Sequence, residues 1–583
     1  MKNSQMNIKI YSVSLPVCVL GVKEVLLRKL NTLRLDLGKN LSFSTDNTNL
    51  NIDMGCAAKH IVLCSSRTDV SSIKNAQIIP VIFDKDEELH DSIKHINAFV
   101  YNKRRKHKDS SNEQLCNVIL EKLGIIRNTK NVFISYKRED TSKLANKIWK
   151  RLVIEGYAVF LDKKKIDIGV DFMDRIRYAI ADADVFILLD SPGYFSSVYT
   201  KKEMYAACLS RVPIIMLTQE KAENAEKAEK YDFVYQYLKS NDTVSDEEFQ
   251  CLIKRIREIQ EQTHIYRLSK IRTKFKGFEG NKEIQLSNLY IPNKGDRKIC
   301  SIHAIYGIPK TTDLEAIQKD ELNPNVKVAA IYDDLCLPKS CYEHVEWLNN
   351  EMRGIELVKM SNMQEEIDQK LLGYKKEKNK NSSRPRVFLS ASVPNADDGN
   401  YDYLKIHDIV VTLTYEVIKR GGTLVFGGHP TITPIIQNVM EIMGYDRQSG
   451  IYPDIRLYQS KYFKEEYQLE VKLFPEELLH ETEIRGENVE TGENSKMASL
   501  KYMRTRMIID DGIKFTSAVF LGGKYVITPK DSGVWEEYEM FKMHHKNARC
   551  LFFENTGNVP KSLKNKEKPE CEFDSIEKLP DLL

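Results

Sequence analysis

The stretch that decides the fold of this chain is Val132-Phe133-Ile134-Ser135-Tyr136-Lys137-Arg138-Glu139-Asp140. Its first three residues are apolar and predict a short buried strand, and polar residues follow directly. Further apolar runs of strand length follow at 158–161, 185–189 and 212–217, and helical patterns separate them. Strands that are apolar throughout and alternate with helices predict a parallel sheet that is covered on both faces.

This stretch resembles the start of a TIR domain, and further matches to that family follow in order along the chain. The second strand ends in Val159-Phe160-Leu161-Asp162, and a loop that contains Gly169 leads to the next helix. The third strand runs into Asp190-Ser191-Pro192-Gly193-Tyr194, and the residues from Ser197 to Glu203 open the following helix. The resemblance implies an α/β fold with a flavodoxin-like parallel sheet.

Resemblance to the TIR enzymes that cleave NAD implies that Glu203 is the catalytic residue, with Tyr199 four positions earlier. Breaking the bond between nicotinamide and ribose gives an oxocarbenium-like transition state, which a nearby carboxylate stabilises. Nicotinamide leaves as a neutral base, so no second carboxylic acid is needed to protonate it. Taken alone, a glutamate beside Lys201 and Lys202 is usually a solvated surface residue. The register with the TIR pattern is what favours catalysis.

The predicted NAD-binding residues lie near the carboxyl ends of the expected strands, where open α/β sheets bind ligands. An aromatic residue followed by two cations suits a nicotinamide ring or a pyrophosphate. Asp162 has an alternative role, in which it shapes its loop through an Asx-turn. Arg138 and Asp140 could likewise be only a pair at the helix start. The predicted NAD-binding set is Ser135, Tyr136, Lys137, Arg138, Asp162, Gly169 and Tyr199.

The last 200 residues carry a second set of signals, which resembles the SLOG superfamily and its LOG-type phosphoribohydrolases. Two Gly-Gly pairs follow expected strands, at 427–428 and 522–523, where backbone NH groups can approach a phosphate. By position, Arg506 and Glu537 match the arginine and the glutamate of those enzymes. Leu521, Val534 and Met507 depart from the family pattern, and an insertion follows Gly523. These departures favour a pocket that binds a nucleotide without hydrolysing it.

The C-terminal region looks more like the SLOG branch that accompanies NAD-cleaving domains in bacterial anti-phage systems of the Thoeris type. In that branch the pocket senses a cyclic ADP-ribose isomer, whose pyrophosphate suits cations and whose ribose hydroxyls suit a carboxylate. Arg506 is favoured over Arg504, since residues two apart on a helix point to different faces. The predicted signal-binding set is Ser390, Gly427, Gly428, Arg504, Arg506, Gly523, Lys524 and Glu537.

The length of the chain and its polar, linker-like stretches predict four parts: residues 1–125, 130–275, 296–375 and 384–583. The second is the expected TIR domain and the fourth is the expected Rossmann-like SLOG domain. The first is an α/β module that distantly echoes the TIR strands, and an unrelated small α/β domain is an equal alternative. The third is a connecting α/β region without a functional signal.

Composition excludes several classes of protein. The 583 residues include 87 basic and 83 acidic residues, so the formal charge of +4 gives no reason to expect nucleic acid as a partner. No run approaches the ~20 apolar residues of a membrane-spanning helix. The 11 cysteines form no Cys-x-x-Cys pair, which favours free thiols in the cytoplasm and predicts no metal site. No prosthetic group is expected.

Together, the two sites predict an anti-phage effector that hydrolyses NAD+ when a cyclic ADP-ribose-type nucleotide binds its C-terminal pocket. TIR active sites of this kind are commonly completed by a neighbouring copy, so a homo-oligomer is expected. Two alternatives remain at this point. The chain could synthesise a cyclic ADP-ribose signal, or it could be a non-enzymatic TIR scaffold.

Overall fold

The computed structural model divides the chain into two compact units, each of which contains two of the four sheets of its described residues. The first unit comprises Met1–Thr129, Arg257–Tyr332 and Leu348–Tyr374, and the second comprises Lys130–Ile256, Asp333–Trp347 and Lys375–Leu583. The structure describes all residues except 1–6, 14, 16–20, 33–40, 45–57, 74–76, 85, 97, 102–107, 123–129, 162–171, 220–232, 241, 277–282, 285–287, 293–297, 306, 321–325, 353, 372–383, 396–397, 446–449, 464–473, 487–493, 511 and 569–571.

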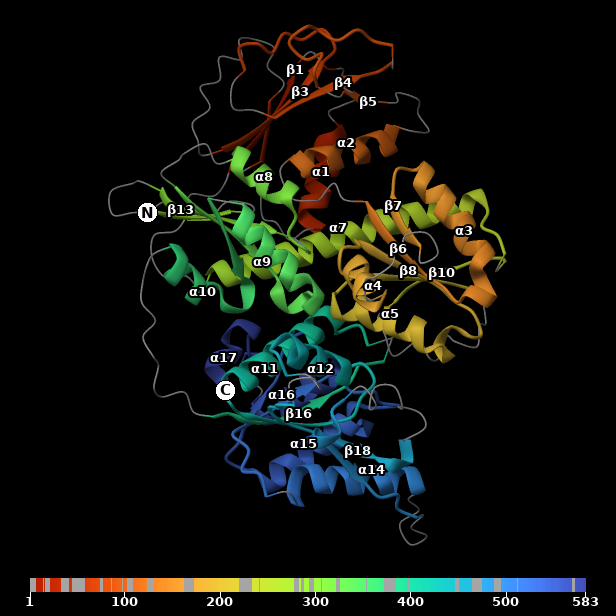
Figure 1. Cartoon of the computed structure of the whole chain (residues 1–583), viewed down its shortest axis with the longest axis vertical. Coiled ribbons are helices and arrows are strands. Elements are labelled where there is room, and N and C mark those ends of the chain that lie inside the picture. Colours follow the sequence, from red (N-terminus) through yellow and green to blue (C-terminus); the bar gives the residue numbers. More distant parts are fainter. Residues whose placement is uncertain are drawn as a thin grey trace. The chain divides into compact units, whose positions relative to one another are not determined.

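The N-terminal module is a five-stranded parallel sheet with the strand order β2-β1-β3-β4-β5. Figure 1 labels β1, β3, β4 and β5 of this sheet and its helices α1 and α2. Helices α1 (Gly21–Thr32) and α2 (Lys108–Lys122) pack against each other, and both contribute to its core. Apolar residues of the central strands and of these helices are fully buried, as the pattern of short apolar strands requires. The strands are β1 (Asn7–Val13), β2 (Leu41–Ser44), β3 (Ala58–Ser65), β4 (Gln77–Ile82) and β5 (Phe99–Val100).

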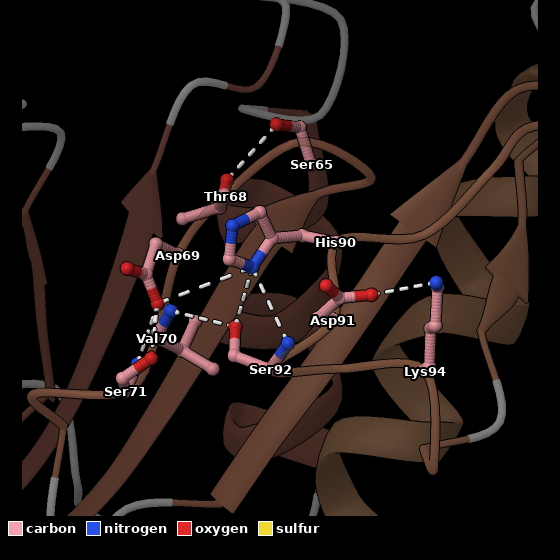
Figure 2. A network of polar contacts seen from close by, with 9 residues as sticks. All are labelled: Ser65, Thr68, Asp69, Val70, Ser71, His90, Asp91, Ser92 and Lys94. Atoms are coloured by element: carbon pink, nitrogen blue, oxygen red, sulfur yellow. Dashed lines mark hydrogen bonds and ion pairs between the residues drawn. The ribbon is translucent and has the colours of Figure 1, made fainter.

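A polar network follows the carboxyl end of β3 in this module (Figure 2). Asp69 accepts hydrogen bonds from the backbone and side chain of Ser71. His90 Nδ1 lies 2.9 Å from Ser92 Oγ and 4.0 Å from Asp69 Oδ1. Ser92 Oγ also accepts the Val70 NH, at 3.1 Å. The same His90 nitrogen faces both the serine and the aspartate, so this is a loop-stabilising network and not a nucleophile relay.

The other sheet of the first unit is mixed, with the order β11-β12-β13-β14-β15. β12 (Asn288–Pro292) pairs antiparallel with β13 (Lys298–Ile305), whereas β14 (Lys327–Tyr332) and β15 (Ile355–Lys359) continue in parallel. β11 (Glu283–Ile284) pairs with β12. The sheet therefore begins before residue 296, where the sequence analysis placed the start of the connecting region.

The second unit opens with a parallel sheet that has the order β10-β9-β8-β6-β7. Its strands are β6 (Asn131–Ser135), β7 (Ala158–Leu161), β8 (Val185–Leu189), β9 (Ile214–Thr218) and β10 (Val234–Tyr237). α4 (Phe172–Ala181) and α5 (Val198–Leu209) follow β7 and β8, as expected from the alternating pattern. Its core stacks Phe133 between Phe160 and Phe186.

Two helices of this region differ from the sequence expectation. The helical spacing of the sequence predicts a helix over 142–155. α3 (Arg138–Ile154) begins four residues earlier, because a first turn precedes a kink at Thr141, whose φ and ψ are −126° and 20°. α7 (Asp246–Lys276) has 31 residues, and the division between the two compact units falls inside it. The sequence 222–230, expected to be a surface helix or lid, lies outside the described residues.

The C-terminal sheet is entirely parallel, with the order β19-β18-β17-β16-β20-β21. The chain builds outward from β16 in one direction and then returns to add β20 on the other side. The switch in direction lies between β16 and β20, where open α/β sheets bind ligands. The strands are β16 (Arg386–Ala391), β17 (Thr423–Gly427), β18 (Asp454–Ser460), β19 (Leu479–Thr482), β20 (Ser517–Leu521) and β21 (Arg549–Leu551).

Helices α11 (Tyr403–Lys419), α12 (Thr433–Ile442), α14 (Ser495–Thr505) and α15 (Gly533–His544) alternate with these strands. α11 is buried along most of its length, since it packs into the larger apolar cluster of this module. Within the described part of the chain, no helix is both long and apolar enough to cross a membrane. The same residues contain no cluster of His, Cys, Asp and Glu side chains suited to a metal ion.

Candidate functional site

The start of α5 is built so that Glu203 faces inward. Ser197 caps the helix by accepting the Thr200 NH at 3.4 Å. Thr200 Oγ1 bonds back to the Tyr194 carbonyl in the preceding 3₁₀ helix η2 (Tyr194–Ser196), which fixes the angle at which α5 leaves the sheet edge. Glu203 lies on the same face of α5 as Thr200, one turn later, and is only 8% exposed.

A serine hydroxyl at the end of the neighbouring strand contacts the Glu203 carboxylate. Ser135 Oγ, at the end of β6, donates to Glu203 Oε2 at 2.6 Å. The Tyr194 hydroxyl lies 2.8 Å from Ser135 Oγ. Tyr194 is fully buried, and burial together with the neighbouring Glu203 charge raises the pKa of its hydroxyl well above its usual range. The acid predicted to be catalytic therefore sits at the carboxyl edge of β6, as expected for a ligand site.

The loop after β6 closes against the loop after β8. The Lys137 ammonium lies so close to Gly193 that a Cβ at that position would overlap it. Asp140 Oδ2 accepts the Gly193 NH at 3.1 Å. Tyr136 is buried, whereas Arg138 at the first turn of α3 is exposed. Of the predicted NAD-binding residues, Ser135 contacts Glu203 directly, and Lys137 lies against Gly193 in the loop that precedes α5.

The remaining residues of the predicted NAD-binding set are placed differently. Tyr199 is 66% exposed at the start of α5, so its ring is accessible for stacking. Asp162 and Gly169 lie outside the described residues. Tyr194 was not in the predicted set, although it belongs to the quoted sequence after β8. A tyrosine that follows a Pro-Gly turn at the carboxyl end of a strand is the signal that would have identified it.

The carboxyl edge of the C-terminal sheet gathers most of the predicted signal-binding residues. Ser390 lies near the end of β16, and the Gly522-Gly523 pair follows β20 at the switch in strand order. Ser390 is 1% exposed, and its hydroxyl finds no hydrogen-bond partner within the described part of the chain. The Thr482 hydroxyl, at the end of β19, is likewise buried and without a described partner. Buried hydroxyls without partners are rare, and an ordered water, an ion or a polar ligand can supply the missing hydrogen bond.

One NH group of each glycine pair bonds to a backbone carbonyl of the protein. Gly522 and Gly523 have φ values of +68° and +111°, and a Cβ on Gly522 would lie 1.6 Å from the Ser392 carbonyl oxygen. The Gly522 NH donates to the Thr556 carbonyl, and the Gly428 NH donates to the Tyr458 carbonyl. The expectation that these two NH groups face a phosphate is therefore wrong, because backbone carbonyls already accept them.

Arg504 and Glu537, both predicted to contact the signal, pair with each other. Arg504 Nε donates to Glu537 Oε1 at 3.1 Å, and Arg504 also contacts Glu536. The guanidinium lies over the start of α15, where a Cβ on Gly533 would be 2.3 Å from Arg504 Nη2. Arg504 therefore orients Glu537. Arg506 begins the π-helical turn η9 (Arg506–Asp510), and its charge contributes, after burial, to lowering the pKa of His480. Lys524 is exposed after the Gly-Gly pair.

Family comparisons agree with both geometries. A TIR domain model matches residues 132–253, and a model of the SLOG cluster3 family matches residues 398–579. The chain joins a TIR domain to a SLOG domain. Ser390 lies before the matched SLOG range, although β16 belongs to the SLOG sheet.

A solved structure with a similar chain is that of the activated Roq1 resistosome directly recognizing the pathogen effector XopQ, in its TIR domains. The identity is 17% with a TM-score of 0.16, and the match covers 23% of this chain and 84% of that chain.

Arg211 connects the TIR domain to the SLOG domain in the interior of the second unit. It follows α5 directly, is 4% exposed and has a left-handed backbone with a φ of 54°. Its guanidinium pairs with Asp408 on SLOG helix α11 and, at 2.7 Å, with Asp333. Arg211 Nε donates to His407 Nδ1 at 3.2 Å. Leu209, the last residue of α5, packs against the apolar core of the SLOG domain. The C-terminal end of the helix that carries Glu203 therefore contacts the SLOG domain.

Proposed function

We propose that the TIR domain cleaves NAD+ between nicotinamide and ribose, and that the SLOG domain controls this activity by binding a cyclic ADP-ribose-type nucleotide. The observation that carries the proposal is the Glu203 carboxylate, which is buried at the carboxyl edge of β6 and oriented by Ser135. An acid in that position serves a reaction that develops positive charge at the sheet edge.

In the proposed reaction the C–N glycosidic bond breaks, and its electron pair leaves with nicotinamide, which becomes a neutral base. The ribose carbon becomes oxocarbenium-like, and the Glu203 carboxylate stabilises its charge. Water then adds to that carbon and releases a proton, which gives ADP-ribose; an internal nucleophile gives a cyclic form instead. Exposed Tyr199 supplies a stacking face, and Lys137 supplies a positive charge for the pyrophosphate.

The test is to incubate the purified full chain with NAD+, alone and with isomers of cyclic ADP-ribose, and to follow nicotinamide release and the ribose products. We expect turnover that depends on the added nucleotide. Product analysis distinguishes hydrolysis from cyclisation. Absence of nicotinamide release under every ligand would contradict the enzymatic proposal.

The proposed signal site is the carboxyl edge of the SLOG sheet around the β16–β20 switch. The unpartnered Ser390 hydroxyl and the Arg504-oriented Glu537 carboxylate supply hydrogen-bonding groups for ribose hydroxyls and polar ring atoms. Arg506 and Lys524 supply charge for a pyrophosphate. The departures from the hydrolase pattern at Leu521, Val534 and Met507 support binding without hydrolysis.

Calorimetric titration of the full chain with cyclic ADP-ribose isomers tests this site. Removing one charged hydrogen bond costs about 1.5–3 kcal/mol, so Arg506→Ala combined with Lys524→Ala should weaken binding by about 100-fold or more. Lys530→Ala is a matched control, because Lys530 is an exposed cation of the same loop. Unchanged affinity in the double variant, with the control behaving identically, would place the ligand elsewhere.

The Arg211 cluster supplies a route by which SLOG occupancy can act on the TIR site. α11 starts after β16 and holds Asp408, while α5 carries Glu203 near its middle and is followed by Arg211. A ligand that shifts the SLOG sheet edge therefore acts on an element already tied to the catalytic helix. For a clean switch the ligand must favour the active state by about 5.5 kcal/mol. We include self-association in the proposal, and light scattering with and without the nucleotide tests it.

A further inference from the structure

The hydrogen bonds of Ser135 fix the direction of the polar chain beneath Glu203. A serine hydroxyl carries one proton, and Ser135 donates it to Glu203 Oε2 at 2.6 Å. Ser135 Oγ also lies 2.8 Å from the Tyr194 hydroxyl. Because Ser135 has no second proton, the tyrosine is the donor in that contact. The chain of hydrogen bonds is therefore donated from Tyr194 to Ser135 and from Ser135 to Glu203.

Tyr194 is suited to remain a donor. Its hydroxyl is fully buried, and burial with the Glu203 charge raises its pKa well above its usual range, so it keeps its proton. A second acceptor, the Thr200 carbonyl oxygen, lies farther away at 3.5 Å. The shorter contact to Ser135 is the better hydrogen bond. The ring itself packs in the core of the TIR domain, which fixes the position of the hydroxyl.

We propose that Ser135 and Tyr194 are positioning residues for Glu203, which orient its carboxylate and favour its ionised form in a buried site. The proposal rests on the proposed NAD-cleaving function, in which Glu203 faces a developing positive charge. Burial alone disfavours a charged carboxylate, whereas a hydrogen bond donated to the charged form favours it. A chain of two donors polarises its members and strengthens the last bond. Ser135 thereby acts through Glu203, in place of the NAD contact that its position in the sequence predicted.

The other titratable groups near Tyr194 stay unchanged in the test. Cys208 lies on α5, and burial raises its pKa to about 12, so its thiol is neutral. Asp190 follows β8 and accepts a hydrogen bond from Thr218 Oγ1 at 2.6 Å. On the loop after β6, the Lys137 ammonium lies against Gly193. None of these groups is altered in the hydroxyl variants, so a change in pH behaviour there follows from the lost hydroxyl.

The experiment measures nicotinamide release across pH for Ser135→Ala, Tyr194→Phe and the double variant. We expect kcat to fall about 10- to 100-fold for Ser135→Ala and about 3- to 10-fold for Tyr194→Phe, with KM nearly constant. The acidic limb of the kcat profile should move to higher pH in both. The double variant should be no slower than Ser135→Ala, because the chain is already broken there.

The control is Tyr205→Phe, which removes another buried hydroxyl from α5 and the same core cluster. It should leave kcat and the acidic limb unchanged. Equal effects of Tyr205→Phe and Tyr194→Phe, additive losses in the double variant, or an unshifted acidic limb would each overturn the proposal.

A second readout separates this proposal from the proposed function. Carbon-13 NMR of the full chain labelled at the glutamate carboxyl carbons, with Glu203→Gln to identify the Glu203 signal, follows its titration without any turnover. We expect the titration midpoint to rise by about one pH unit in Ser135→Ala, and by less in Tyr194→Phe. If no NAD+ is cleaved but this shift is seen, the hydrogen-bond relay from Tyr194 to Glu203 is supported and the proposed substrate is wrong. An unchanged midpoint in both variants overturns the positioning role.

Discussion

The N-terminal module and the TIR domain have the same strand order, but the described part of the connection between the third and fourth strands differs. Their sheets run β2-β1-β3-β4-β5 and β7-β6-β8-β9-β10, and all strands in both are parallel. In the TIR domain, α5 connects the third strand to the fourth and carries Glu203. In the N-terminal module the corresponding connection is residues 66–76, and the described part, 66–73, forms turns.

The polar groups at these two sheet edges lie in different environments. Glu203 and Tyr194 are buried against the TIR sheet, whereas the side chains of Asp69 and His90 are 62% and 39% exposed. Electrostatic interactions of the buried Glu203 are strong, because little solvent screens them. The exposed network of Asp69 and His90 is screened by solvent and stabilises its own loop. The two modules thus share a topology and a sheet edge. The connecting segment determines whether that edge carries a buried acidic group.

The sharpest test of this difference compares one acid from each module. Glu203→Gln should reduce nicotinamide release by at least about 100-fold, because it removes the charge that faces the transition state. The matched variant is Glu87→Gln in the N-terminal module, where Glu87 accepts the backbone NH groups of Phe83 and Asp84. It should leave the rate unchanged. A folded Glu87→Gln protein that loses activity would show that the N-terminal module contributes to the chemistry.

The other end of α5 should control stability. Arg211→Met leaves Asp408 and Asp333 without their cation and should lower the free energy of unfolding by about 3–5 kcal/mol, measured by denaturant titration. Adding Asp408→Asn should recover part of that loss. Arg151→Met is the control, since its partner Asp246 is almost fully exposed, and the expected cost is below about 1 kcal/mol. Equal costs for the two arginines would remove the distinction between a buried and an exposed cluster.

The smallest effect is expected in the N-terminal network. Hydrogen bonds from the Ser71 side chain and backbone lower the pKa of Asp69. A lowered pKa in the folded state means that the contribution is complete above the unfolded value of about 3.9, and is lost as pH falls through the folded value. Asp69→Asn should therefore speed hydrogen exchange of the Ser71 amide slightly at neutral pH, with the difference vanishing in acid.

Asp91→Asn serves as the comparison for that experiment, because Asp91 pairs with Lys94 at the surface. It should leave exchange at Ser71 unchanged. A large, pH-independent effect of Asp69→Asn would contradict the view that this network is a loop support in solvent.

Much of the TIR fold could be predicted from the sequence, because its signals are local. The apolar run 185–189 predicts β8 to the residue, and the spacing of Ile176 and Ile180 predicts a helix over 172–181, which is α4. Glu203 was identified through register with a family pattern, and the structure brings it to Ser135. Whether Glu203 cleaves NAD+ stays a prediction.

What the sequence could not provide depends on contacts between distant segments. Tyr194 and Ser135 are 59 positions apart, and no local pattern pairs them. The NH groups of Gly428 and Gly522 were expected to face a phosphate, but carbonyls from β18 and from Thr556 accept them. The pairing of Arg504 with Glu537 was also missed, because helix spacing says nothing about a partner on another helix.

The left-handed backbone at Arg211 predicts a sequence feature of chains that join these two domains. Helices α3 and α11 end with a glycine in the left-handed conformation, Gly156 and Gly421, whose NH bonds back to the last turn. α5 ends in the same way, but with Arg211 in the glycine position. The left-handed conformation alone favours glycine at this position. The arginine is therefore explained by its ion pairs with Asp333 and Asp408. Among related chains, we expect the cation at 211 and the acid at 408 to covary, and glycine to return where no SLOG domain is attached.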